Sequence, residues 1–154
     1  MKAIHWIIAA AAIACAEPVQ AAVGDPEVII YRFPGVRDDG GGTNAGEATV
    51  FHCTNFSGVT ETIRFVTRNT TGTLLQNSTD SIPHLATRTA VTHPTVAFAN
   101  NLNLATSVVQ GTTAIAATST NIICTAMTID ASTTAPVGVA LRGIRFNPVP
   151  GSQE

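Results

Sequence analysis

Two cysteines, Cys53 and Cys124, have the clearest potential for chemistry in this sequence. Each lies within a strand-like stretch, 49–55 for the first and 121–130 for the second. Two thiols can oxidise to a disulfide, stay as buried thiols or ligate a metal. Zinc normally takes four cysteine or histidine ligands with tight local spacing, whereas only His52 adjoins a cysteine here. We therefore expect a disulfide, with free thiols or metal ligation as the alternative.

Three histidines, His52, His84 and His93, form a second candidate set together with Asp38 and Asp39. A small hydrolase or a metal-dependent enzyme could use them if the fold brought them together. Their spacing does not require this, because the sequence has no His-x-His pair and no Gly-x-Ser-x-Gly nucleophile motif. The two aspartates open a glycine-rich loop that lacks the alternating ligands of a calcium loop. We predict no catalytic residue, no cofactor and no metal site, and keep the enzyme as the alternative.

The start of the chain resembles an export signal. One lysine precedes an apolar run from Ile4 to Ala14, which is too short to span a bilayer, and small residues follow. We expect residues 1–22 to be a signal peptide and the mature protein to be periplasmic or extracellular, with no transmembrane segment. Cys15 ends a stretch similar to a lipoprotein box, so a lipid-anchored envelope protein is the alternative.

Export also supports the disulfide, because disulfides form and persist in oxidising compartments. Chain-entropy reasoning assigns roughly 4 kcal/mol to a bridge that closes a loop as long as that between Cys53 and Cys124. That is a large share of the stability of about 5–15 kcal/mol typical of a native domain.

Composition narrows the fold and the partners. The formal net charge is -2 and no run of Lys and Arg occurs, which argues against nucleic-acid binding. Threonine accounts for 23 of 154 residues, a bias toward strands, and we find no convincing helical periodicity after the leader. We expect one all-β domain at 23–147 and a C-terminal tail at 148–154.

Strand-like stretches alternate with turn residues along that domain. They are predicted at 27–33, 48–55, 60–69, 74–75, 87–93, 96–98, 112–118, 122–130 and 137–146. About seven to nine strands at this spacing predict an antiparallel, immunoglobulin-like β-sandwich. Alternation places Ile63 and Phe65 on one face of their strand, and Arg64 and Arg68 on the other. We also expect 48–55 and 60–69 to form a hairpin, and Gly143 to mark a β-bulge.

The cysteine strands also carry a resemblance. The Cys-Thr-Asn sequence at 53–55 and the late Ile-Cys-Thr-Ala sequence at 123–126 resemble those of small exported bacterial β-sandwich proteins with one strand-to-strand cysteine pair. The resemblance covers most of the mature chain and implies no activity. The domain lacks the tryptophan that packs on the bridge of true immunoglobulin domains.

These observations predict an exported, non-enzymatic structural or binding module. Its partner is unknown, and an envelope or extracellular protein is the class that export suggests.

Overall fold

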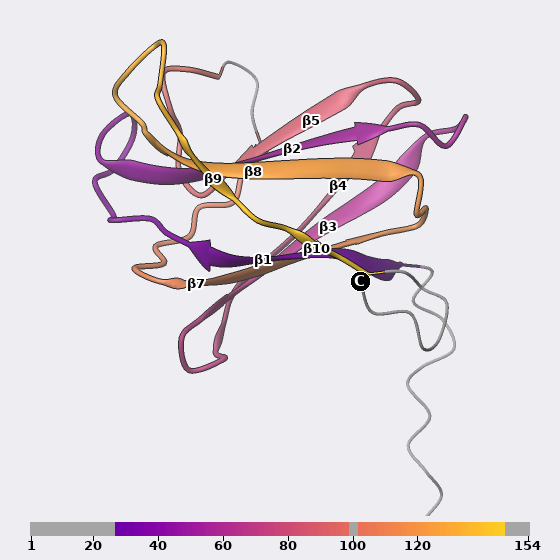
Figure 1. Cartoon of the computed structure of the whole chain (residues 1–154), viewed down its shortest axis with the longest axis horizontal. Helices are drawn as coiled ribbons and strands as arrows, with labels where there is room; N and C mark the ends of the chain where they lie inside the picture. The colour runs from indigo at the N-terminus through magenta and orange to yellow at the C-terminus, as the bar shows by residue number, and fades with distance from the viewer. Residues whose placement is uncertain (1–26, 99–101, 147–154) are drawn as a thin grey trace, which may run out of the picture.

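The computed structural model describes residues 27–98 and 102–146, and this part of the chain contains strands and no helix (Figure 1). The strands are β1 (Val28–Val36), β2 (Glu47–Asn55), β3 (Glu61–Asn69), β4 (Leu74–Ile82), β5 (Thr87–Val91), β6 (Leu102–Asn103), β7 (Gly111–Ala117), β8 (Ile122–Asp130), β9 (Val139–Leu141) and β10 (Ile144–Arg145). No helix that could cross a membrane occurs in the described ranges. The predicted signal peptide at 1–22, Cys15 and the tail at 148–154 lie outside them.

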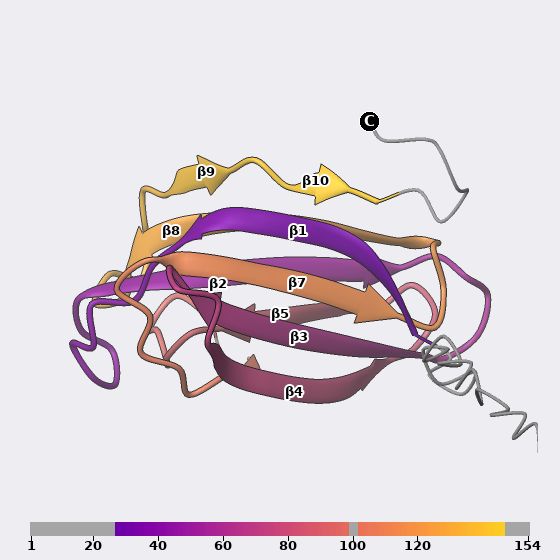
Figure 2. The ribbon, with the colours of Figure 1, turned by 90° about the horizontal axis from the view of Figure 1, so that it is seen from below.

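The strands form two five-stranded sheets arranged as in a β-sandwich, which confirms the all-β prediction (Figure 2). Sheet A has the order β10-β1-β7-β3-β4, and sheet B the order β6-β5-β2-β8-β9. Only β5 and β6 pair in parallel. The first and last long strands therefore lie in different sheets, with β1 beside β7 and β8 beside β2.

The main core fills the space between the sheets. Phe51 of sheet B meets Phe33 and Phe65 of sheet A, with ring centroids 5.7 and 5.9 Å apart respectively. All three rings are essentially excluded from solvent. Burying each aromatic side chain contributes about 1.5–3 kcal/mol, so this trio does much to hold the sheets together. Ile63 and Phe65 share one face of β3 as predicted, and this face is buried.

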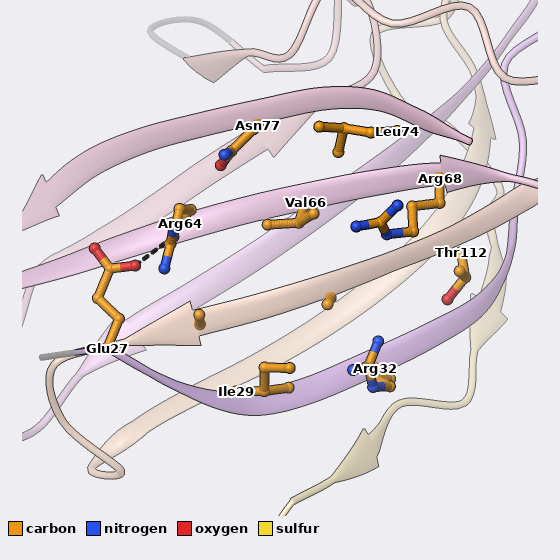
Figure 3. Close-up of a pocket in the computed structure, with 11 residues that line it drawn as sticks. Glu27, Ile29, Arg32, Arg64, Val66, Arg68, Leu74, Asn77 and Thr112 are labelled. Carbon is orange, nitrogen blue, oxygen red and sulfur yellow. Dashed lines mark ion pairs between the residues drawn. The ribbon is translucent and has the colours of Figure 1, made fainter. Parts of the chain in front are cut away.

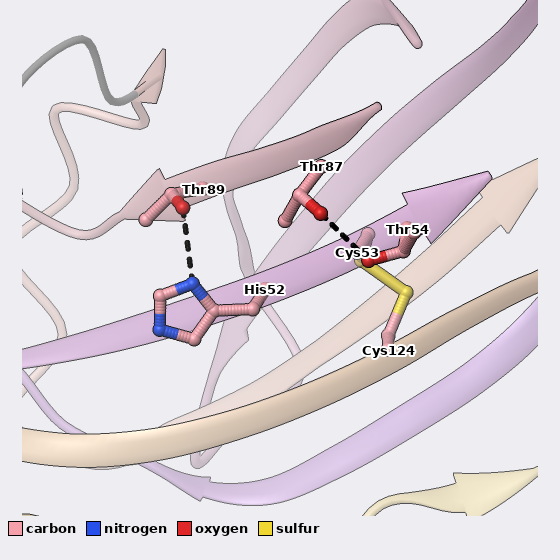
Figure 4. The surroundings of a disulfide bond; sticks show 6 residues. All are labelled: His52, Cys53, Thr54, Thr87, Thr89 and Cys124. Atoms are coloured by element: carbon pink, nitrogen blue, oxygen red, sulfur yellow. Dashed lines mark hydrogen bonds between the residues drawn. A yellow bond between two sulfur atoms is a disulfide. The ribbon is translucent and has the colours of Figure 1, made fainter. Parts of the chain in front are cut away.

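The disulfide joins Cys53 and Cys124, which lie 71 residues apart in sequence and directly opposite each other on β2 and β8 (Figure 4). It links neighbouring strands of sheet B and does not cross between the sheets. The Cα–Cα distance of 4.1 Å fits the closely spaced, non-hydrogen-bonded type of antiparallel pair. Nearby on the same sheet, the Thr54 and Thr87 hydroxyls hydrogen-bond at 2.8 Å.

The predicted hairpin of 48–55 and 60–69 is wrong. β2 belongs to sheet B and β3 to sheet A, so the turn between them crosses the sandwich. Asn55, at the end of β2, makes this corner: its Nδ2 donates to the Val59 and Ile82 carbonyls at 2.7 and 2.8 Å, and its Oδ1 accepts from the Ser57 amide at 2.8 Å. The buried side-chain amide of Asn55 thus makes hydrogen bonds at this corner, where a hairpin would have had backbone pairing between the two strands.

The predicted bulge at Gly143 is also wrong, because the chain changes sheets there. β9 pairs with β8 in sheet B, and β10 pairs with β1 in sheet A. A Cβ at Gly143 would lie 2.4 Å from the Phe33 ring, so glycine is needed for the backbone to pass over that ring. The C-terminal strands close one side of the sandwich (Figure 2).

The two outer faces differ. The segment after β5 covers part of sheet B, where Ala97 and Phe98 pack on Val50, Val91 and Ile129. Residues 96–98 are therefore not the predicted strand, since the described segment is a bend that serves as a cover. The outer face of sheet A has no comparable cover from the described residues, and the candidate site lies there.

Candidate functional site

The outer face of sheet A carries a trough that follows the central strand β7. The pairing register aligns three outward rows across the sheet: Ile29–Ala116–Arg64, Arg32–Ala114–Val66 and Thr112–Arg68–Leu74. Small residues on β7 thus stand between longer side chains on β1 and β3. Ala114 and Ala116 are almost fully buried, at 6% and 4% exposure respectively, because their longer neighbours shield them. The trough has an alanine floor and walls made by the adjoining strands.

We call this trough the arginine groove (Figure 3). Its volume is about 440 Å³, within the range of about 300–1,000 Å³ common for ligand pockets. It is lined by Glu27, Ile29, Arg32, Arg64, Val66, Arg68, Leu74, Asn77, Thr112, Ala114 and Ala116.

The charges of the groove are unbalanced. Arg64 forms an ion pair with Glu27 at one end. Arg68 donates to the Gly72 carbonyl at 2.8 Å, and the Arg32 guanidinium lies 5.4 Å from the centre of the Phe146 ring. Among the described residues, neither Arg32 nor Arg68 has a carboxylate within ion-pair distance. Positive charge therefore exceeds negative in this groove, although the chain as a whole is acidic.

The side chains that line the arginine groove favour the binding of an anion. A guanidinium presents a rigid fork of donors that matches carboxylate and phosphate oxygens. The one carboxylate among the described lining residues, Glu27, is engaged by Arg64. The Thr112 hydroxyl donates to the Phe33 carbonyl at 3.2 Å. The groove can hold an anion, and its described side chains do not form a nucleophile–base pair.

Two of the residues singled out from the sequence do come together. His93 Nδ1 lies 2.7 Å from Asp38 Oδ2, and its Nε2 lies 2.9 Å from the Ala45 carbonyl oxygen. The second Asp38 oxygen accepts from the Gly40 amide at 2.8 Å. Both side chains are buried, at 2% exposure for Asp38 and 8% for His93. Each ring nitrogen of His93 faces an acceptor, and both acceptors, Asp38 and Ala45, belong to the glycine-rich loop. We call this contact the Asp38–His93 clasp.

His52 and His84 lie apart from that clasp. His52 is on the outer face of sheet B, 3.0 Å from the Thr89 hydroxyl (Figure 4), and burial lowers its pKa below 6.5. His84 accepts from the Gly58 amide at 3.0 Å. Within the described ranges no three His, Cys, Asp or Glu side chains gather closely enough to hold a metal.

Asp39 is exposed and belongs to the turn of its own loop. Hydrogen bonds from the backbone of Glu47 and Gly41 lower its pKa below 3.8. The Gly41 amide lies 3.0 Å from its Oδ1. Asp38 is therefore the partner of the buried His93, whereas Asp39 accepts hydrogen bonds from the backbone of its own loop.

Sequence reasoning missed the arginine groove. Alternation predicted that Arg64 and Arg68 share a face of their strand, and this is confirmed: both line the groove on the outer face of sheet A. Alternation does not show which strand pairs with β3. The approach of Arg32, more than thirty positions away, follows from both β1 and β3 pairing with β7.

No protein-family model matches the chain, and no curated protein or solved structure matches it.

Proposed function

We propose that this chain is an exported, non-enzymatic binding module whose arginine groove takes an anionic ligand. The observation that carries the proposal is the position of Arg32 and Arg68 on opposite sides of the alanine floor, without carboxylate partners among the described residues. Such guanidinium groups attract carboxylates and phosphates, and they do so more strongly in a partly enclosed groove than in open water.

The non-enzymatic part of the proposal is supported by the Asp38–His93 clasp. A histidine that acts as a general base must have a ring nitrogen within hydrogen-bond reach of the substrate proton that it removes. In His93 both ring nitrogens face protein acceptors, at 2.7 and 2.9 Å. This pair is the closest approach to an acid–base set among the predicted residues, and its geometry favours a structural role.

Export is supported by the leader-like sequence and by the disulfide, which is typical of oxidising compartments. We place the mature protein in the periplasm or outside the cell, among small exported bacterial sandwich proteins. Mass spectrometry of the mature N-terminus tests this: a start near Val23 supports a free exported protein, whereas an acylated Cys15 would show a lipid-anchored one.

We further propose that the sandwich is a variant of the immunoglobulin-like arrangement. The β2–β5 and β3–β7 pairs correspond to the B–E and C–F pairs of that fold. The variation lies in β1 and β8, which take each other's places beside β7 and β2. An experimental structure tests the correspondence through the strand order.

The binding proposal is tested by NMR titration of the mature protein with inorganic phosphate, citrate and benzoate. The double variant Arg32→Gln/Arg68→Gln should weaken the binding of these anions by at least about tenfold. Arg142→Gln removes an exposed arginine outside the groove and is the matched control. Equal affinities for the wild type and the double variant would refute the proposal.

A further inference from the structure

We infer that the ligand of the arginine groove is an amphiphilic anion, with one carboxylate or phosphate head on an aliphatic body. This inference rests on the proposed function and specifies the ligand class. Three features of the groove lead to it: a two-arginine seat, an apolar channel beside that seat, and an ion pair without surplus charge at the channel's far end.

Arg32 and Arg68 form the seat for the head. They stand on β1 and β3 with β7 between them, in neighbouring rows of the register. The two residues are two strand spacings apart across the sheet and two residues apart along it, which places their Cα atoms roughly 12 Å apart. Figure 3 shows the two guanidinium groups on opposite sides of the trough. Their long side chains approach the same anion from both sides, each offering a planar fork of donors.

The channel for the body continues from this seat along β7. Its floor is Ala114 and Ala116. Ile29 forms one side, and Val66, followed by Arg64 near the far end, forms the other. Ile29 remains 37% exposed. An aliphatic body lying against Ile29 would remove this apolar surface from water, which a purely hydrophilic anion would not do.

The far end of the channel argues against a linear polyanion. Glu27 lies there and pairs with Arg64, so the surplus positive charge is confined to the seat of Arg32 and Arg68. A second anionic group farther along a polymer would meet the Glu27–Arg64 ion pair, which offers it no surplus positive charge. The described lining contains no aromatic ring, so the platform on which sugar rings commonly stack is also missing.

The test compares four probes on the mature wild-type protein, each below its aggregation concentration: octanoate, octyl phosphate, acetate and 1-octanol. Octanoate or octyl phosphate should bind at least about tenfold more tightly than both acetate and 1-octanol. The tighter of the two identifies the head. Equal binding of 1-octanol would show nonspecific apolar adsorption, and equal binding of acetate would show that the body is irrelevant. Either result overturns the inference.

Variants test whether the eight-carbon probes bind in the arginine groove. Arg32→Gln and Arg68→Gln should each weaken octanoate binding by at least about tenfold, while Arg142→Gln leaves it unchanged. Ala114→Leu fills the floor without altering charge and should also abolish binding of the eight-carbon probes. Retention of octanoate binding by Ala114→Leu, in a variant with wild-type thermal stability, contradicts the inference. If a variant does not fold, the four-probe comparison on the wild type still decides.

The outcomes separate this inference from the proposed function. Phosphate or citrate binding that depends on Arg32 and Arg68, with neither octanoate nor octyl phosphate bound more tightly than acetate, overturns only the amphiphilic ligand. Absence of any arginine-dependent anion binding overturns both.

Discussion

Cys53 and Cys124 face each other across β2 and β8, two neighbouring strands of the same sheet, with their Cα atoms 4.1 Å apart. The bridge therefore fixes the register of β2 against β8, and the buried core, with its three phenylalanine rings, makes the contact between the sheets. Because the bridge closes a loop of 71 residues, its main effect is expected on the unfolded chain.

Loss of the bridge should lower stability substantially. We expect Cys53→Ala/Cys124→Ala to reduce the free energy of unfolding by about 2–5 kcal/mol, measured by urea unfolding. The wild type under reducing conditions should show a similar loss, and reductant should not affect the double variant. An unfolding curve of the wild type that does not respond to complete reduction would contradict this role.

Asn55 should be a second point of high sensitivity, because its buried amide ties the corner between β2 and β3. Asn55→Ala leaves the Val59 and Ile82 carbonyls without this donor. We expect a loss of about 1–3 kcal/mol in unfolding free energy. Asn77→Ala, at an exposed position on β4, is the matched control and should change stability by less than about 0.5 kcal/mol. Similar losses in both variants would count against the corner.

The Asp38–His93 clasp should also be important for stability. Asp38→Asn removes the charged partner of a buried histidine, for which we expect a cost of about 3 kcal/mol by urea unfolding. Asp39→Asn changes the adjacent, exposed carboxylate and should cost clearly less. If the two variants were equally stable, the clasp would not be the element that holds the loop.

Stability should fall on mild acidification because of His52. Burial lowers its pKa from 6.5 in the folded state, so the unfolded chain takes up a proton at a higher pH than the folded one. The stability is complete above the unfolded pKa and declines as pH falls from about 6.5 toward the folded pKa. His52→Gln should reduce the difference in unfolding free energy between about pH 7.5 and pH 5.

That pH window separates His52 from the aspartates with lowered pKa values. Hydrogen bonds from Ser132 lower the pKa of Asp130, and backbone hydrogen bonds lower that of Asp39, in each case from 3.8. Both carboxylates lose their stabilising contribution only at lower pH. An unchanged difference between pH 7.5 and pH 5 in His52→Gln would exclude a contribution from this histidine.

Local patterns in the sequence predicted most of the strands and the faces of β3, although residues 96–98 form a bend. Phe65 and Arg64 alternate as expected, and the polar run in β4 was missed because an edge strand exposes residues on both faces. Pairing across long sequence distances was not predictable, so the β2–β3 crossing was mistaken for a hairpin. The same limitation hid the groove, since Arg32 and Arg68 become neighbours of one trough only through β7.

The central claim, that the arginine groove binds an anion, is tested most directly by mapping a saturating anion on the mature protein by NMR. Our account predicts that benzoate shifts the side-chain Nε–H signals of Arg32 and Arg68 and the amide signals of Ala114 and Ala116, and leaves Arg142 unaffected. Equal shifts at Arg142, or saturable shifts confined to another face, would contradict it.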